Sequence, residues 1–320
     1  MKDYMAPMEG VTNFIYRNVY HDFYHPMDKY FTPFISAKPN KRLSRKEICE
    51  VSEETNKGLY VVPQIMTNCA EDFIQTARIL KEGYGHNEIN LNLGCPSGTV
   101  TAKKKGAGFL GEPLLLERFL DSIYTKLDMD ISIKTRVGVT VEKDWEYLLD
   151  IYRKFPIYEL IIHPRIQKDL YQGPVRIEAY NKACERLSLS LGYNGDIHSR
   201  EDYDRIIGSI KRADSVMYGR GLVAAPWLLG SIRSDSRPDK KVFREFHNRL
   251  YEEYKKNVSG DRNVLFRMKE IWSYMITSFT DCKKYAKKIK KAQHLSEYEA
   301  AVSSLFAEQE LIENEKYRKL

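Results

Sequence analysis

The chain has 320 residues, of which 42% are hydrophobic and 30% charged, with a net charge of +7, so it is long and apolar enough for a large domain plus a smaller one. No run approaches about 18 uninterrupted apolar residues, and the opening Met1-Lys-Asp-Tyr has no apolar leader, which excludes a membrane protein and favours a cytoplasmic one. The five cysteines are odd in number and form no C-x-x-C pair. This argues against a disulfide framework and against a metal site.

Most of the chain alternates strand-like apolar runs with amphipathic segments of helical length. The predicted strands are Tyr4–Met8, Tyr30–Ile35, Leu59–Ile65, Glu88–Leu93, Ile131–Val137, Tyr158–His163, Leu187–Tyr193 and Ser215–Tyr218. The predicted helices between them include Ala70–Glu82, Leu114–Lys126, Trp145–Phe155, Val175–Glu185 and Arg200–Ser209. Parallel strands joined by crossover helices give this alternation, and eight such units predict an α/β fold of the TIM (β/α)8 barrel type.

The predicted strands end in polar residues and glycines, and barrel enzymes place their chemistry at those ends. The ends are Pro7-Met8-Glu9, Gln64, Asn92 with Cys95, Lys134 with Arg136, His163 with Arg165, Asn194-Gly195-Asp196 and Gly219-Arg220. We expect them to converge on one face of the barrel.

The run Glu88–Leu93 ends abruptly in Gly94, Cys95 and a proline, which presents the thiol at an open strand end. Asn90 and Asn92 alternate with apolar residues, so both amides point to one side of the strand and need polar partners such as a ligand. An inert buried cysteine is the competing interpretation.

After about Pro226 the pattern predicts helices only. They are Lys240–Lys256, Asn263–Ser278, Thr280–Gln293 and Ser296–Glu313. Ser231–Asp239 is the predicted linker, which gives a barrel domain over 1–230 and a helical domain over 240–320.

The C-terminal region carries most of the excess positive charge. From residue 241 onward there are 17 Lys and Arg against 12 Asp and Glu, so +5 of the net +7 lies there. Positions 283, 287, 290 and 291 fall on one face of a predicted helix, a stripe suited to a phosphate backbone. A solvated lysine-rich surface is the alternative.

Gly106-Ala-Gly-Phe-Leu-Gly111 has the G-x-G-x-x-G spacing of dinucleotide-binding turns. It follows Lys103-Lys-Lys105 instead of a strand, and Pro113 comes soon after it. A Rossmann site is therefore not predicted.

Six groups of residues together resemble one known family, the tRNA-dihydrouridine synthases, in order and spacing over essentially the whole barrel. They are Ala6-Pro-Met-Glu-Gly-Val11, Asn92-Leu-Gly-Cys-Pro-Ser97, Lys134-Thr-Arg-Val-Gly138, His163-Pro-Arg165 with Tyr171-Gln-Gly173, Asn194-Gly-Asp-Ile197, and Gly219-Arg-Gly221 with Pro226-Trp227. The basic helical region matches in character. The chain departs from the family at His163-Pro-Arg-Ile166, where His-Gly-Arg-Thr is usual.

The resemblance implies an FMN enzyme that uses NADPH, with NADH as an alternative donor, to reduce the C5=C6 bond of particular uridines in tRNA. A flipped-out uridine would accept hydride at C6, and Cys95 would be the catalytic proton donor to C5. The partner would be tRNA and the protein a monomer. The loop after Cys95 would be mobile, and its lysines would meet phosphates of the RNA.

The resemblance also implies two sets of binding residues. Those expected to bind the cofactor are Pro7, Met8, Glu9, Gln64, Asn92, Lys134, His163, Asn194, Gly195, Asp196, Gly219 and Arg220. Those expected to bind the substrate are Asn92, Arg136, Arg165, Lys103, Lys104, Lys287 and Lys291. Asn194-Gly195-Asp196 and Gly219-Arg220, which end the seventh and eighth predicted strands, would hold the FMN phosphate. Lys134 would stabilise negative charge on the reduced flavin ring.

Two other functions remain open from the sequence. The first is an FMN barrel acting on a free pyrimidine, such as a dihydroorotate dehydrogenase, although such an enzyme has no need of a basic helical tail. The second is an RNA-binding protein that kept the barrel and lost catalysis. Retention of Cys95, Lys134 and Asn92 together argues against the second.

Overall fold

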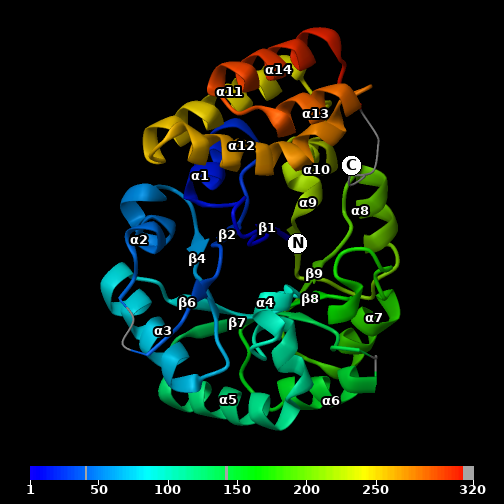
Figure 1. Ribbon diagram of the computed structural model, residues 1–320. Helices are drawn as coiled ribbons and strands as arrows, with labels where there is room; N and C mark the ends of the chain where they lie inside the picture. Colours follow the sequence, from blue (N-terminus) through cyan, green and yellow to red (C-terminus); the bar gives the residue numbers. More distant parts are fainter. Residues whose placement is uncertain (40–41, 141–142, 313–320) are drawn as a thin grey trace. The chain divides into compact units, whose positions relative to one another are not determined.

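The computed structural model describes residues 1–39, 42–140 and 143–312 (Figure 1). The chain forms two compact units. The first unit comprises residues 1–7, 28–195 and 207–217, and the second comprises 8–27, 196–206 and 218 onward. The predicted boundary between a domain over 1–230 and one over 240–320 stays a prediction.

The strands of the described residues form one ten-stranded sheet, and its paired residues lie in the first unit. The strands are β1 (Lys2–Met5), β2 (Lys29–Phe31), β3 (Ile35–Ser36), β4 (Val61–Val62), β5 (Gln64–Met66), β6 (Glu88–Leu93), β7 (Asp130–Arg136), β8 (Leu160–His163), β9 (Leu191–Asn194) and β10 (Ser215–Tyr218). Their order is β3-β5-β6-β7-β8-β9-β10-β1-β2-β4, and neighbouring strands run parallel.

Two predicted strands are each split by a proline. Pro33 lies between β2 and β3, and Pro63 alone separates β4 from β5. Proline has no backbone N–H to give to a ladder, so the regular pairing stops there. Because β4 and β5 form one continuous segment, the two ends of the strand order meet and the sheet closes. If β2 with β3 and β4 with β5 are each counted as one strand, the sheet has the eight strands of the predicted TIM barrel.

The strand predicted from Tyr158 begins at Leu160, and the one predicted over Ile131–Val137 is Asp130–Arg136. Two further predicted strands have shifted bounds because a local hydrogen bond ends or precedes them. Tyr4–Met8 is replaced by β1, since the carbonyl of Met8 accepts the N–H groups of Val11 and Thr12 and begins a turn. Leu187–Tyr193 begins only at Leu191, since the N–H of Leu187 still caps the preceding helix.

The helices of the first unit follow the predicted alternation. They are α2 (Arg45–Val51), α3 (Ala70–Tyr84), α4 (Gly98–Thr101), α5 (Pro113–Lys126), α6 (Lys143–Tyr152) and α7 (Ile177–Arg186). Their ends have local causes: Ser44 and Glu47 form a capping box before α2, and Gly85 ends α3 at a φ of +75°. Figure 1 shows α3, α5, α6 and α7 around the outside of β6 to β9.

The second unit is helical, as predicted for the C-terminal region. Its helices are α1 (Phe14–Phe23), α8 (Arg200–Ile207), α9 (Arg220–Ala224), α10 (Leu228–Ser234), α11 (Lys240–Asn257), α12 (Asp261–Met275), α13 (Lys283–Lys291) and α14 (Leu295–Glu308). No described helix is both long and apolar enough to cross a membrane.

Some expected bounds in this unit are wrong. The linker predicted over Ser231–Asp239 begins as part of α10 and leaves the helix only at Asp235, which has a φ of +52°. The helix predicted to Glu313 ends at Glu308, and residue 313 lies outside the described residues.

Buried aromatic rings hold α11, α12 and α14 together. Phe306 packs against Phe243 with ring centroids 5.8 Å apart and against Trp272 at 6.1 Å. The hydroxyl of Tyr298 accepts the indole N–H of Trp272 at 2.7 Å and lies 2.7 Å from Nε2 of His247. Burial lowers the pKa of His247 to about 4, so this ring is neutral and belongs to the core.

Adjacent leucines on α5 test how much the barrel's outer layer contributes to stability. Leu116 is fully buried, whereas the neighbouring Leu115 is 51% exposed. Leu116→Ala should lower the free energy of unfolding by about 2–5 kcal/mol because it leaves a cavity. Leu115→Ala should change it by less than about 0.5 kcal/mol. Denaturant unfolding measures both, and equal losses would contradict the packing of α5 described above.

Candidate active site

Cys95 lies on a turn that Asn92 holds in place at the end of β6. Oδ1 of Asn92 accepts the backbone N–H groups of Gly94 and Cys95, each at 3.0 Å. Its Nδ2 donates to Oε1 of Gln64 at 2.6 Å. The thiol of Cys95 is not part of a disulfide and is half-buried. Asn92 therefore sets the backbone from which the thiol projects.

The glycine-rich segment after Cys95 returns to the same turn. Residues Gly106–Gly111 form a 3-10 helix that follows α4, not a strand, so the spacing is not a Rossmann turn. The N–H of Ala107 donates to the carbonyl of Cys95 at 3.0 Å. A Cβ on Gly106 would lie 2.8 Å from that carbonyl oxygen, and its φ is +55°. Gly106 thus allows a close backbone approach.

Gln64, Asn90 and Ser132 stand in a row across three strands. The register pairs Gln64 with Asn90 and Asn90 with Ser132, so their side chains face the same side. Nε2 of Gln64 donates to Oδ1 of Asn90 at 2.8 Å, and Nδ2 of Asn90 donates to Oγ of Ser132 at 2.9 Å. The sequence predicted polar partners for the two asparagines, and the structure supplies them from the protein.

The amine of Lys134 is hydrogen-bonded to the side chain of Asn194. Its Nζ donates to Oδ1 of Asn194 at 2.7 Å, while Nδ2 of Asn194 donates to the carbonyl of Met217 at 2.7 Å. Burial and, to a lesser extent, the charge on Arg136 lower the pKa of Lys134, Cys95 acts in the opposite direction, and the net result is a pKa of about 7. The amine can therefore change charge close to neutral pH.

Arg136 connects the Cys95 turn to the loop after β8. Its Nε donates to the carbonyl of Gly94 at 3.0 Å, and its other nitrogens donate to the carbonyls of Ile166 and Leu170. The side chain is 1% exposed, and burial lowers its pKa to about 10. The structure therefore shows Arg136 as a brace. Its expected contact with substrate stays a prediction.

His163 and Arg165 are buried together beneath the same loop. Nη1 of Arg165 lies 3.1 Å from Nε2 of His163, and its Nε donates to the carbonyl of Gly173. An arginine can only donate, so Nε2 of His163 is the acceptor and the ring is neutral. Where the chain departs from the family, the carbonyl of Pro164 accepts the N–H of Arg176 at 2.7 Å, which anchors the loop.

Tyr171 is a site residue that the sequence analysis did not assign. Its ring lies over the guanidinium of Arg136 at 5.3 Å and stacks on His163 at 6.4 Å, and it is half exposed. The Tyr171-Gln-Gly173 motif was the available signal. Its role is visible only once the loop is folded over Arg136 and His163.

The lysines expected to meet RNA lie at the surface of their elements. Lys103 and Lys104 are exposed after α4, and Lys104 forms an ion pair with Glu112. Lys287 and Lys291 are exposed on α13, whose Tyr285 and Ile289 are buried. The spacing of this helix thus separates a lysine face from an apolar one.

The other expected cofactor residues divide between the two units. Pro7, Asn194 and Gly195 belong to the first unit. Met8, Glu9, Asp196, Gly219 and Arg220 belong to the second. Within the second unit, Nη2 of Arg220 donates to Oδ1 of Asp196 at 2.9 Å. A Cβ on Gly221 would lie 2.1 Å from the carbonyl oxygen of Ile197, so α9 packs directly on that segment.

Solved structures share the fold of this chain. A morphinone reductase variant in complex with tetrahydroNAD matches with a TM-score of 0.52 and 13% identity, covering 76% of this chain and 90% of that one. A variant of NCR from Zymomonas mobilis matches with a TM-score of 0.51 and 12% identity, covering 77% and 90%. Together with a thiol, an amine and amides at the strand ends, this fold defines a TIM-barrel enzyme.

The chain belongs to the dihydrouridine synthase (Dus) family, whose model matches residues 4–319. It is similar to tRNA-dihydrouridine synthase B of Pasteurella multocida, with 26% identity over 242 residues, 75% of this chain and 71% of that protein. It is also similar to the tRNA-dihydrouridine(16) synthase of Vibrio parahaemolyticus, with 26% identity over 305 residues, 91% of this chain and 92% of that protein.

The family match confirms the resemblance found in the sequence and makes this protein a flavin-dependent oxidoreductase. It favours a tRNA-modifying enzyme over both alternatives, an enzyme of free pyrimidines and a non-catalytic RNA-binding protein.

The lowered pKa of Lys134 makes the stability of the protein without cofactor depend on pH. Between about 7 and 10.5 the unfolded state holds the proton and the folded state has lost it, so the free energy of unfolding rises with pH. Lys134→Met should flatten this rise. The exposed Lys154 is the control, and Lys154→Met should keep the wild-type slope. Denaturant unfolding at several pH values between about 7 and 10.5 measures how the free energy of unfolding depends on pH. Equal slopes in the wild-type protein and both variants would refute the lowered pKa of Lys134.

Proposed function

We propose that this protein reduces the C5=C6 bond of uridine in tRNA with FMN and NADPH, and that Cys95 donates the proton to C5. NADH is an alternative electron donor. The observation that carries the proposal is the Cys95 turn held by Asn92, one strand from Lys134, in a member of the Dus family.

The residues around Lys134 fit a flavin. The pKa of Lys134 is shifted by burial, by Arg136 and by Cys95, and no carboxylate of the described residues is among these causes. The site therefore favours an anionic ligand, which would in turn raise the pKa of the amine. Bound FMN would supply the hydride that adds to C6 of the uracil ring.

Lys134 would donate to the flavin from a position that Asn194 holds, and Gln64 would line the ring. Asn194 cannot turn freely because the carbonyl of Met217 holds its Nδ2, so its Oδ1 keeps the amine of Lys134 in position. A positioned cation stabilises negative charge as it develops on the reduced ring. The roles proposed for Asp196, Gly219 and Arg220 at the FMN phosphate stay predictions.

Cys95 is suited to protonate C5 of a uracil. A base inside folded RNA must be flipped out before an enzyme can act on its ring. A thiol with a reference pKa near 8.5 keeps its proton at pH 7 yet releases it readily to a developing carbanion. Asn92 and Arg136 hold the turn from both sides, so the thiol stays at the end of β6.

The surface lysines would contact tRNA phosphates. Lys287 and Lys291 are exposed on α13, and Lys103 and Lys104 lie on the loop after Cys95. Contacts of this kind provide affinity and orientation without reading the sequence of the RNA. We propose that the protein acts as a monomer in the cytoplasm.

Cys95→Ala tests the proton donor. NADPH should still bleach the flavin at nearly the wild-type rate, because the thiol takes no part in that step. Dihydrouridine formation should fall by about a hundredfold to ten-thousandfold, the usual contribution of general acid catalysis. Stopped-flow flavin reduction and its reoxidation by tRNA measure the two steps. Cys49→Ala, at another half-buried cysteine, is the control and should keep both. Normal reoxidation with normal product in Cys95→Ala would exclude this role.

The double variant Lys287→Gln, Lys291→Gln tests the RNA contact. Each lost phosphate contact should reduce the slope of log affinity against log salt by about 1, so the variant should lose about 2. Lys284→Gln is the matched control on the same helix, since Lys284 is paired with Glu308 at 3.1 Å. Titrations with tRNA at several salt concentrations measure the slopes. An unchanged slope in the double variant would place the contact elsewhere.

A further inference from the structure

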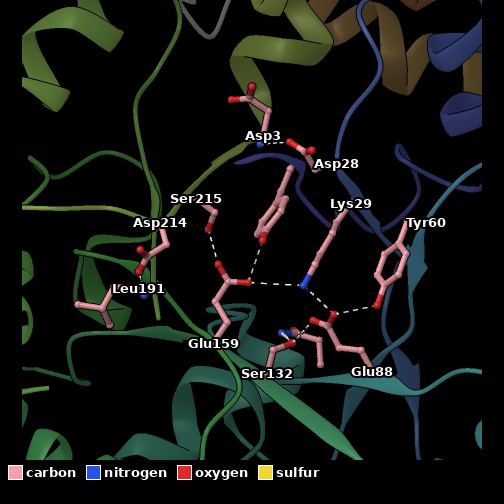
Figure 2. A network of polar contacts seen from close by, with 12 residues as sticks. Asp3, Asp28, Lys29, Tyr60, Glu88, Ser132, Glu159, Leu191, Asp214 and Ser215 are labelled. Carbon is pink, nitrogen blue, oxygen red and sulfur yellow. Dashed lines mark hydrogen bonds and ion pairs between the residues drawn. The ribbon is translucent and has the colours of Figure 1, made fainter. Parts of the chain in front are cut away.

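The barrel interior contains a buried ion cluster where TIM barrels usually have apolar layers. Nζ of Lys29 lies 2.6 Å from Oε2 of Glu88 and 3.7 Å from Oε2 of Glu159, and these side chains are 7%, 2% and 3% exposed (Figure 2). Glu159 also accepts hydrogen bonds from Tyr4 and Ser215. Buried ion pairs add little net stability, so this cluster calls for another role.

One side of the cluster is joined to the Cys95 turn by an unbroken chain of hydrogen bonds. Oε1 of Glu88 accepts from Oγ of Ser132 at 3.0 Å (Figure 2), and that oxygen accepts from Asn90 at 2.9 Å. Asn90 accepts from Gln64 at 2.8 Å, and Gln64 accepts from Asn92 at 2.6 Å. Each residue in the chain donates toward Glu88.

The direction of these hydrogen bonds follows from the bond between Ser132 and Glu88. A carboxylate can only accept, so the hydroxyl of Ser132 must donate to Glu88, and its oxygen is left to accept from the NH₂ of Asn90. A side-chain amide has its acceptor on one arm and its donors on the other. The orientation of Asn90 therefore sets that of Gln64, and Gln64 sets that of Asn92.

At the far end, the same direction turns the oxygen of Asn92 toward the turn. The two groups that it meets, the N–H of Gly94 and the N–H of Cys95, are donors and require an acceptor. A reversed amide would present an NH₂ group to both N–H groups and leave them unsatisfied. The charge on Glu88, which Lys29 neutralises, thus fixes the turn that carries the thiol.

We propose that Glu88 and Ser132 are positioning residues for Cys95, because they set the direction of the amide chain through Asn90 and Gln64 to Asn92. Their importance for catalysis rests on the function proposed above. Their effect on the turn does not, since it concerns the protein alone.

The second carboxylate of the cluster provides matched controls. Glu88 and Glu159 both flank Lys29 and are both buried, but only Glu88 is joined to the amide chain. Likewise Ser132 and Ser215 are both fully buried and each donates to one of these carboxylates. The test pairs are Glu88→Gln with Glu159→Gln, and Ser132→Ala with Ser215→Ala.

The readout is the rate at which iodoacetamide alkylates Cys95 in the full-length protein, followed by mass spectrometry of the peptide that contains it. Glu88→Gln and Ser132→Ala should raise this rate about tenfold. In both variants the amide chain loses its fixed direction, so the turn is no longer assured of Oδ1 of Asn92 as its buried hydrogen-bond acceptor. Glu159→Gln and Ser215→Ala should leave it within about twofold. Rates that are unchanged, or that change equally within a pair, overturn the proposal, and the serine pair decides if Glu88→Gln does not fold.

Flavin kinetics on the same variants connect the turn to catalysis. Glu88→Gln and Ser132→Ala should slow reoxidation by tRNA about tenfold while NADPH bleaching stays near wild type, and the two controls should keep both rates. A wild-type protein that forms no dihydrouridine would refute the proposed function. The alkylation rates would still decide whether Glu88 positions the thiol.

Discussion

The orientation of one side-chain amide, that of Asn92, is the constraint on which the site depends. Its oxygen accepts two backbone N–H groups of the turn, and its nitrogen donates to Gln64. A buried donor without a partner costs about 1–3 kcal/mol, and Asn92 pairs both of these part-buried N–H groups. The turn therefore has one favoured form, and that form places a half-buried thiol at the end of β6.

Arg136 applies a second constraint from the neighbouring strand. A guanidinium with three backbone carbonyls as acceptors is rigid, and here it joins the Cys95 turn to the loop that carries Tyr171. The cation remains in the site as a fixed positive charge. This charge, together with burial, lowers the pKa of Lys134 toward neutrality, so the brace also tunes the amine.

Much of the fold could be predicted because hydrophobic runs and helical spacing are local properties. Glu88–Leu93 was predicted with the bounds that β6 has, and α5 differs from its prediction by one residue. The misses have local causes as well. Pro63 splits one strand, and the N-terminal α1 was not recognised between β1 and β2. The extension of α10 through Ser234 was missed because Ser and Arg residues resemble a linker.

The sequence by itself determined the barrel, the family and the strand ends at which Cys95, Lys134 and Asn92 lie, because alternation and motif spacing follow directly from residue order. Only the tertiary structure decided which polar groups pair inside the barrel. Lys29, Glu88 and Glu159 stand on separate segments, and nothing in their local sequence indicates a shared cluster. Register across β5, β6 and β7 brings Gln64, Asn90 and Ser132 into one row, since directly paired residues of neighbouring strands face the same side.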